Sequence, residues 1–418
     1  EEMLLTSLRD INPRLSLEAI NEAIFKLKNY DSINLLQKNR VFMDYLQNGI
    51  DVGALYKGEM KYDRVRLIDY DRPESNHFYV INQWTVVENA EKRADVVVFV
   101  NGLPLVVMEL KSCSREETDV SDAYRQLRNY MLDIPCLFTY NAFCVMSDLA
   151  TSKVGTITSG EDRFMEWKTI NGDYEETKYA AFDVLFKGVF QKDRLLDIIK
   201  NFLLFSDDNK ILAGYHQYYA VKKAIERTRT AAETDGKGGI FWHTQGSGKS
   251  LSMVFYTKLL QEALQSPTVV VLTDRNDLDD QLYGQFARCA DFLRQTPEQA
   301  ENRADLQNRL AGRIANGIIF TTMQKFEESD EPLSKRRNII MIADEAHRSQ
   351  YALEEKIDAK TGKISLGFAR LVRDSLPHAT FIAFTGTPIS LTDRSTHEVF
   401  GDYIDIYDMT QSVRDGAT

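Results

Sequence analysis

Three charged residues, Asp95, Glu109 and Lys111, could together form a catalytic site. They bracket the segment "DVVVFVNGLPLVVMELK", in which two apolar stretches flank "NG", a strong short-range signal for a β-hairpin. Glu109 and Lys111 are two residues apart, so on a strand their side chains point to one face. Two carboxylates on one metal ion, with a cation beside them, could cleave a phosphodiester. The alternative is that these charged strand ends simply meet solvent.

The length of the hairpin loop decides whether Asp95 shares the face of Glu109. A three-residue loop over residues 101–103 places Asp95 opposite Glu109. A two-residue loop turns Asp95 to the other face, because neighbouring strand residues alternate sides. The residues leave both registers open, and the metal chemistry favours the three-residue loop.

A second candidate site is "HTQGSGKS", residues 243–250, between an apolar strand and a helix. Backbone N–H groups at Gly246 and Gly248 could close around phosphate oxygens, and Thr244 and Ser247 complete the loop. Lys249 would reach the terminal phosphates. His243 stands where the usual motif has its first glycine, so a glycine-rich turn without nucleotide is the alternative.

The hydroxyl of Ser250 would ligate magnesium at this second site. Further along, "IIMIADEAH" predicts a buried strand with Asp344 at its carboxyl end, where open parallel sheets bind ligands. Asp344 could hold the same magnesium through water, and Glu345 could orient or deprotonate the attacking water. Read alone, "DEAH" could also be a capped helix start.

The surrounding sequence predicts two α/β domains. Helical spacing over residues 16–48 is followed by period-two alternation over residues 65–109, then by a helix in "DVSDAYRQLRNYML". Helices continue to about residue 205, and we expect the domain boundary at 203/204. Beyond it, apolar strands alternate with helices, which predicts a parallel sheet covered on both faces.

Composition sets broad limits. The chain has 418 residues, of which 43% are hydrophobic and 27% charged, with a formal net charge of -11. That charge argues weakly against nucleic-acid binding, although it could hide a local basic channel. No apolar run is long enough for a membrane span, no signal peptide is evident, and four cysteines without CxxC spacing suit a reducing cytoplasm. Because residue 1 is Glu, we expect the chain to begin inside a longer one.

"GSGKS", "DEAH" and "TGTP", in this order, resemble motifs I, II and III of superfamily 2 helicases and translocases. The resemblance implies that Gln217 reads adenine, and that His347, Thr385 and Thr387 couple the ATP site to the strand-binding face. It also implies that "VLTDRNDLDDQL" and "FTTMQKF" touch the nucleic-acid backbone, although each also fits a plain strand–loop–helix connection. After "TGTP" the chain is too short for a second RecA-like domain, so we expect only the first.

The hairpin with its acidic ends resembles the PD-(D/E)xK nucleases, except that Ala94 replaces the proline before the aspartate. Gln126 and Tyr130 resemble the QxxxY element of a subset of these enzymes. "INQWTVVENAEKRADVVVFVNGLPLVVMELKS" followed by "FWHTQGSGKSLSMVF" is similar to the restriction subunits of type I restriction-modification enzymes over nearly the whole chain.

This resemblance implies a magnesium-dependent nuclease domain over residues 1–203 and an ATP-driven translocase domain over residues 204–418. It implies double-stranded DNA as substrate, methyltransferase and specificity subunits as partners, a cytoplasmic location and no membrane. Two rival functions stay open: a nucleic-acid-stimulated ATPase whose nuclease-like domain is only a docking scaffold, and a non-catalytic DNA-binding or assembly module.

Overall fold

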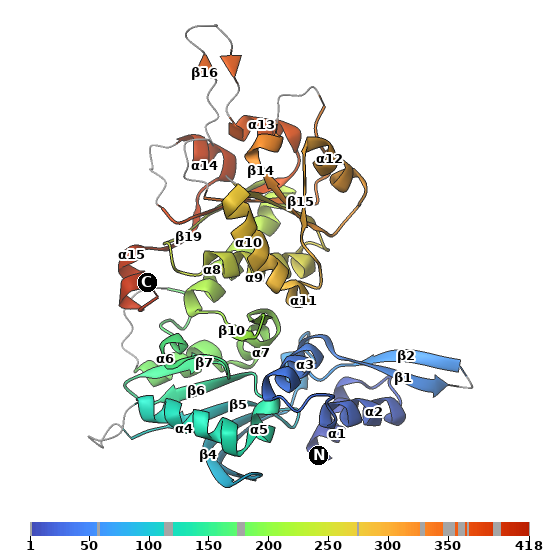
Figure 1. The fold of residues 1–418 in the computed structure, drawn as a ribbon, viewed down its shortest axis with the longest axis vertical. Helices are drawn as coiled ribbons and strands as arrows, with labels where there is room; N and C mark the ends of the chain where they lie inside the picture. The colour runs from blue at the N-terminus through green and yellow to red at the C-terminus, as the bar shows by residue number, and fades with distance from the viewer. Residues whose placement is uncertain are drawn as a thin grey trace. The chain divides into compact units, whose positions relative to one another are not determined.

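The computed structural model divides the chain into two compact units, Glu1–Tyr215 and His216–Thr418 (Figure 1). The residues that it describes are 2–56, 59–112, 120–173, 180–273, 276–326, 331–345, 356–357, 364–365, 368–387 and 394–417. Each unit is α/β, as predicted. None of the described helices combines the length and the apolar character that a membrane span requires.

A six-stranded sheet with the order β3-β4-β5-β6-β7-β8 forms the centre of the first unit. Its pairings are antiparallel except for the parallel pair β5–β6. The strands are β3 (Phe78–Val87), β4 (Glu91–Val100), β5 (Leu103–Leu110), β6 (Phe143–Ser147), β7 (Ser152–Gly155) and β8 (Met165–Glu166). The predicted helix is α4 (Val120–Asp133), which places Ala123, Leu127 and Met131, spaced four residues apart, in one core with strand residues of β4, β5 and β6.

Further helices and two hairpins complete the first unit. Before the sheet come α1 (Glu2–Ile11), α2 (Leu17–Lys28), α3 (Leu35–Asn48) and the antiparallel pair β1 (Ile50–Tyr56) and β2 (Glu59–Val65). After α4 come α5 (Pro135–Thr139), α6 (Ala181–Val189), α7 (Lys192–Asn201), β9 (Leu203–Ser206) and β10 (Asn209–Leu212).

The β9–β10 hairpin, which the sequence-based boundary assigns to the second domain, belongs to the first unit. Lys210 explains why: its ammonium group is buried and donates to Asn39 Oδ1 at 2.9 Å and to Asn141 O at 2.6 Å. These bonds tie the hairpin to residues far earlier in the chain. No local pattern in the sequence marks such contacts.

A seven-stranded sheet with the order β13-β14-β12-β15-β18-β11-β19 forms the second unit, and all its pairings are parallel. The strands are β11 (Lys237–His243), β12 (Thr268–Thr273), β13 (Glu298–Gln299), β14 (Ile318–Thr322), β15 (Ile339–Asp344), β18 (Thr380–Thr385) and β19 (Tyr403–Tyr407). A separate short pair is β16 (Lys356–Ile357) with β17 (Ile364–Ser365).

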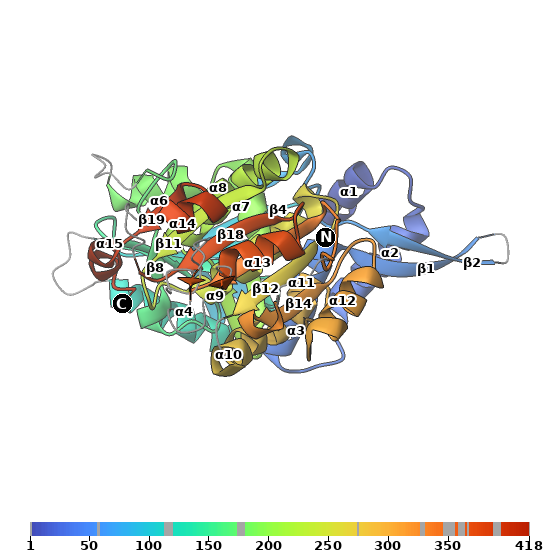
Figure 2. The same cartoon turned by 90° about the horizontal axis from the view of Figure 1, so that it is seen from above.

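Helices cover both faces of this parallel sheet (Figures 1 and 2). On one face lie α12 (Arg303–Ala311), α13 (Phe368–Ser375) and α14 (Arg394–Phe400), and on the other α8 (Tyr215–Glu233), α9 (Lys249–Ala263), α10 (Asn276–Arg288) and α11 (Ala290–Leu293). The chain described here ends with α15 (Met409–Arg414). The covered parallel sheet confirms the fold predicted for the second half.

The turn between β4 and β5 corrects one prediction. The loop has two residues, Asn101 and Gly102, both with positive φ (53° and 83°), and Val100 pairs with Leu103. Asparagine followed by glycine favours this tight turn because both tolerate the left-handed conformation. The expected three-residue loop is therefore wrong.

A β-bulge restores the register that the three-residue loop was expected to provide. Phe99 still pairs with Pro104, but Val98 pairs with Val106, so Leu105 is the extra residue of β5. The shift by one residue exchanges the faces of everything beyond it. From Val98 toward the start of β4, the pairing is the one that sets Asp95 opposite Glu109.

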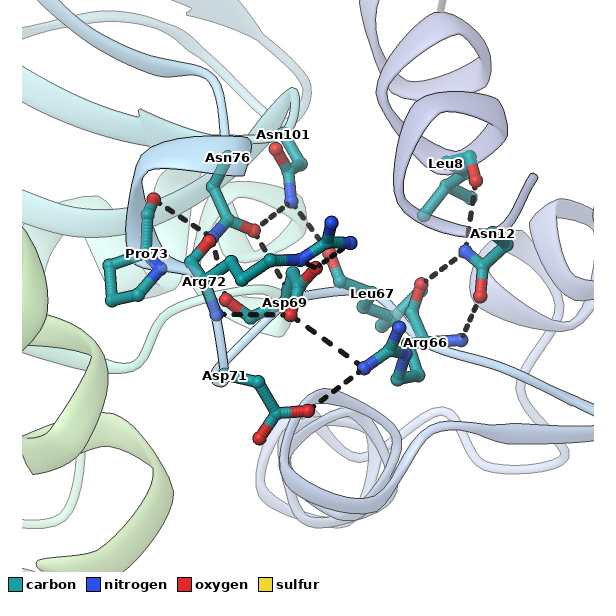
Figure 3. A network of polar contacts seen from close by, with 10 residues as sticks. All are labelled: Leu8, Asn12, Arg66, Leu67, Asp69, Asp71, Arg72, Pro73, Asn76 and Asn101. Atoms are coloured by element: carbon teal, nitrogen blue, oxygen red, sulfur yellow. Dashed lines mark hydrogen bonds and ion pairs between the residues drawn. The ribbon is translucent and has the colours of Figure 1, made fainter.

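A buried polar network fixes this turn (Figure 3). Asn101 is fully buried; its amide donates to Leu67 O and to Asn76 Oδ1, both at 2.9 Å, and its Oδ1 accepts from the His77 N–H at 2.8 Å. Asn76 in turn bonds the backbone of buried Asp69, whose carboxylate pairs with the guanidinium of Arg72 at 2.9 Å. The side chain of Asn101 is thus held by the segment that directly precedes β3.

Replacing Asn101 with glycine tests how firmly the network holds the hairpin. Glycine keeps the positive φ, so Asn101→Gly removes only the three side-chain hydrogen bonds. At about 1 kcal/mol each, we expect roughly 3 kcal/mol less protection of the β4–β5 amides in hydrogen exchange. Asn316→Gly is the matched control, because Asn316 also has positive φ (59°) but is exposed. Equal protection in the two variants would contradict the anchoring role.

Candidate active sites

Asp95 and Glu109 lie together at the open end of the β4–β5 hairpin. Asp95 is half-buried, and its Oδ2 accepts a hydrogen bond of 2.9 Å from the backbone N–H of Leu110, next to Glu109. The ammonium group of Lys111 contacts Glu109 Oε1 at 2.5 Å. The three residues predicted from the sequence are therefore brought to one place.

Glu109 has an environment suited to a cation. It is only 3% exposed, and no donor among the described residues reaches its Oε2. Burial, and then the charge of Asp95, raise the pKa of Glu109, while Lys111 opposes the rise. A buried carboxylate oxygen without a partner is costly unless something pairs with it.

A metal ion would have two protein carboxylates here. Within the described part of the chain, no three His, Cys, Asp or Glu side chains gather as a metal-binding set. Asp95 and Glu109 alone fit magnesium, which commonly takes one or two carboxylates and keeps several waters.

Tyr130 and Gln126 lie on α4 next to this site. The Tyr130 hydroxyl donates to the backbone carbonyl of Arg93 at 2.9 Å, two residues before Asp95, and the side chain is buried. Burial and the nearby charge of Glu109 raise the pKa of Tyr130 to about 12, so it stays a donor. Gln126, one turn earlier, is half-buried. The hydrogen bond of Tyr130 to the Arg93 carbonyl holds β4 in place, and the same hydroxyl lies close enough to Glu109 to help lower the pKa of that carboxyl.

The second candidate site is the loop between β11 and α9. Gly246 and Gly248 have φ of 88° and 82°, a conformation that favours glycine. A Cβ on Gly248 would lie 2.8 Å from Gln217 Nε2. Because Gly248 is the N-cap of α9 and has no side chain, the first N–H groups of the helix are left for a ligand.

The loop is also braced internally. The Ser247 hydroxyl donates to Thr244 O at 2.6 Å, and Lys249 Nζ lies 3.5 Å from the same oxygen. A Cβ on Gly386 would lie 2.9 Å from Lys249 Nζ, so the segment after β18 runs close to this lysine. Ser250, in the first turn of α9, is half-buried.

Asp344, Thr385 and His243 end three adjacent strands, because β18 lies between β15 and β11. Asp344 is in register with Phe384, and Thr385 with Trp242. The carboxyl ends of parallel strands meet at one edge, so the sheet brings these predicted residues together.

Three further residues, Glu345, Thr387 and His347, were predicted for this edge, and the structure describes the first two. Glu345 has a φ of 51°, and its N–H donates to Asp344 Oδ1 at 2.9 Å. The Thr385 hydroxyl donates to Thr387 O at 2.9 Å, bracing the turn after β18. His347 lies outside the described residues.

Gln217 contacts the loop between β11 and α9 itself. Its amide donates to Gly248 O at 3.0 Å and lies 3.4 Å from Ser252 Oγ, and the side chain is buried. These contacts place the start of α8 against the loop.

His243, the departure from the usual loop motif, is explained by a network of hydrogen bonds around buried Asp405. Its Nε2 lies 2.9 Å from Asp405 Oδ2, and Lys223 Nζ lies 2.8 Å from Asp405 Oδ1. Burial opposes ionisation of Asp405, but the bonds from His243 and Lys223 more than offset it and lower its pKa. No local pattern in the sequence indicates this set, because its members come from α8, β11 and β19.

His216 contacts the same loop from α8. Its Nε2 lies 3.1 Å from Ser247 O, and its ring stacks on Tyr407 with centroids 4.2 Å apart. Tyr407 O accepts from the Thr244 N–H at 2.9 Å. The loop is thus held from α8 and from β19 at once.

Comparison with known proteins gives two family matches. The description "Type I restriction enzyme R protein N terminus" matches residues 1–163, and "SWI2/SNF2 ATPase" matches residues 216–418. The HindI type I restriction enzyme endonuclease subunit of Haemophilus influenzae is 42% identical over the whole chain. A sequence named as the MjaIXP type I endonuclease subunit, from Methanocaldococcus jannaschii, is 37% identical over 99% of the chain. The chain spans 41% of the length of each of these two relatives.

The burial of His216 predicts a dependence of stability on pH. Burial, and then the neighbouring His243, lower the pKa of His216 to about 4, so the folded chain holds it neutral. The unfolded chain binds this proton below pH ~6.5. The free energy of unfolding should therefore have its full value above pH 6.5 and decrease by about 3 kcal/mol as the pH falls from 6.5 to 4. Denaturant unfolding at several pH values measures this.

Two variants isolate the contribution of His216. His216→Phe keeps the stack on Tyr407 but cannot titrate, so its stability should fall less steeply over the same pH range. His378→Gln, at an exposed histidine of the same unit, is the control. Identical pH profiles for His216→Phe and the unsubstituted chain would contradict the assignment.

Proposed function

Because the chain belongs to the type I restriction enzyme R proteins, we propose that it unites a magnesium-dependent DNA endonuclease with the first domain of an ATP-driven DNA translocase. Its substrate is double-stranded DNA, and its partners are the methyltransferase and specificity subunits of the same complex in the cytoplasm. The observation that carries the nuclease is the pair Asp95 and Glu109, with a buried Glu109 oxygen that lacks a donor among the described residues.

In the nuclease, Asp95 and Glu109 would hold magnesium. When bound, the ion would supply Lewis acidity toward a phosphate oxygen and a water molecule. Lys111, whose Nζ already lies against Glu109, orients the attacking water and steadies developing negative charge. Tyr130, with Gln126 one turn away, keeps β4 in place through the Arg93 carbonyl.

In the motor, the N–H groups around Gly246 and Gly248 bind the phosphates, in a loop completed by Thr244 and Ser247. Lys249 reaches the terminal phosphates. Ser250 and Asp344 hold the magnesium that accompanies the nucleotide, and Glu345 orients water. The remaining proposed contacts are Gln217 toward adenine and His347, Thr385 and Thr387 toward the DNA-binding face.

Lys111→Ala separates the two activities. We expect the full complex carrying this variant to lose DNA cleavage, because the site loses its only assigned cation, while ATP hydrolysis stays largely intact. Gel assays of cleavage and phosphate release on the same preparation measure both. Lys92→Ala is the matched control: Lys92 lies on the same hairpin in an ion pair with Asp133 at 3.0 Å. Equal loss of both activities in Lys111→Ala would instead show that Lys111 stabilises the fold.

Lys249→Ala tests the nucleotide site in this chain. Superfamily 2 motors bind ATP between two RecA-like domains, and an arginine finger is worth roughly 10³ to 10⁵ in rate in related enzymes. The described residues hold one such sheet. We therefore expect weak magnesium-ATP binding by calorimetry, lost in Lys249→Ala, with negligible DNA-stimulated turnover.

Lys258→Ala is the control on the same helix, where the lysine lies over the ring of Phe292 and should not affect nucleotide binding. Brisk DNA-dependent hydrolysis by the chain alone would contradict the need for a second domain.

A further inference from the structure

Gln83 has an unusual backbone at the position opposite Asp95. On β3, Asn82 pairs with Val96 and Trp84 with Ala94, and the ladder omits the residue between them. Gln83 has a φ of 53°, the left-handed region that a non-glycine residue rarely adopts. The backbone of β3 is therefore strained at this one residue.

The side chain of Gln83 contacts the carboxylate of the proposed nuclease site. Its Nε2 donates to Asp95 Oδ1 at 3.1 Å, while the Leu110 N–H holds Asp95 Oδ2 at 2.9 Å. With a donor on each oxygen, the plane of the Asp95 carboxylate is fixed. Each oxygen has a second lone pair, so a metal contact stays open.

Stability of the fold does not explain this arrangement. Gln83 is exposed, and β3 is the edge strand of its sheet. An exposed side chain buries little apolar surface and its hydrogen bond contributes little, so neither offsets a left-handed backbone. Strained residues that persist without a packing reason concentrate at functional sites.

We propose that Gln83 is a positioning residue of the nuclease: it orients Asp95 so that its carboxylate and that of Glu109 can bind one magnesium ion. This inference rests on the proposed nuclease function. It assigns to the edge strand β3 a part of the site that neither the acidic motif nor the QxxxY element contains.

Gln83→Gly separates positioning from folding, because glycine adopts the same φ without strain but has no amide. In the full-length subunit, we expect unfolding by denaturant to need the same or a higher concentration. Calorimetric magnesium affinity, measured without DNA, should fall about tenfold, as is typical when a partner of a metal ligand is removed. In the assembled complex, cleavage should fall at low magnesium and recover at high magnesium, with ATP hydrolysis unchanged.

Three further variants complete the test. Gln83→Asn tolerates the left-handed backbone but is one methylene shorter, so it should show a partial loss of magnesium affinity. Asn82→Ala, at the exposed neighbour on β3, should match the unsubstituted protein. Asp95→Asn reports on the nuclease itself and should lose cleavage and most magnesium affinity.

The outcomes distinguish the two proposals. Full cleavage and magnesium affinity in Asp95→Asn would overturn the nuclease function. Loss in Asp95→Asn, with unchanged affinity and magnesium dependence in Gln83→Gly, would overturn only the positioning role. Loss of stability in Gln83→Gly together with unchanged magnesium affinity would likewise show that Gln83 serves the fold alone.

Discussion

The register of one β-hairpin decides whether the first unit has a site at all. Asp95 and Glu109 share a face only because the bulge at Leu105 corrects the pairing that the two-residue turn begins. The turn is fixed in its place by the buried amide of Asn101. Beyond it, α4 packs on the hairpin and its Tyr130 bonds the strand that carries Asp95. A slip by one residue would place the two carboxylates on opposite faces of the sheet. It would also turn most of the apolar core side chains of the strand to the other face.

The second unit reaches its site by a different physical route. The carboxyl ends of parallel strands lie at one edge of the sheet. The loop after β11, the threonine turn after β18 and the acidic pair at the end of β15 are therefore neighbours, and no bulge is needed to bring them together. What needs special support is the loop itself. His243, where the motif usually has glycine, is accommodated because burial keeps its imidazole neutral and Asp405, which Lys223 also bonds, provides its hydrogen-bond partner.

The sequence predicted more of the local chemistry than of the long-range contacts. The period-two alternation and the helical spacing of apolar residues located the hairpin, α4 and the parallel sheet. The side-chain types indicated which residues could form the candidate sites. The loop of the hairpin was mispredicted because a bulge leaves no mark in the pattern of apolar residues: Leu105 looks like any other strand residue. Lys210 and Asp405 could not be predicted either, because their partners lie in other elements far along the chain. Such partners are chosen by tertiary packing, which periodicity does not encode.

In each unit, some of the residues with left-handed backbone lie at or near the candidate site. Asn101 turns the hairpin, Gln83 lies opposite Asp95, and Glu345 follows directly on Asp344. Gly248, at the start of α9, is another such position. A residue with positive φ changes the direction of the chain within one peptide unit, which regular strand or helix geometry does not allow. A side chain or an N–H group can therefore point in a direction that a regular element would not give it. Regular elements supply the rigid frame in each unit, and these single irregular residues aim the groups that would meet metal and phosphate.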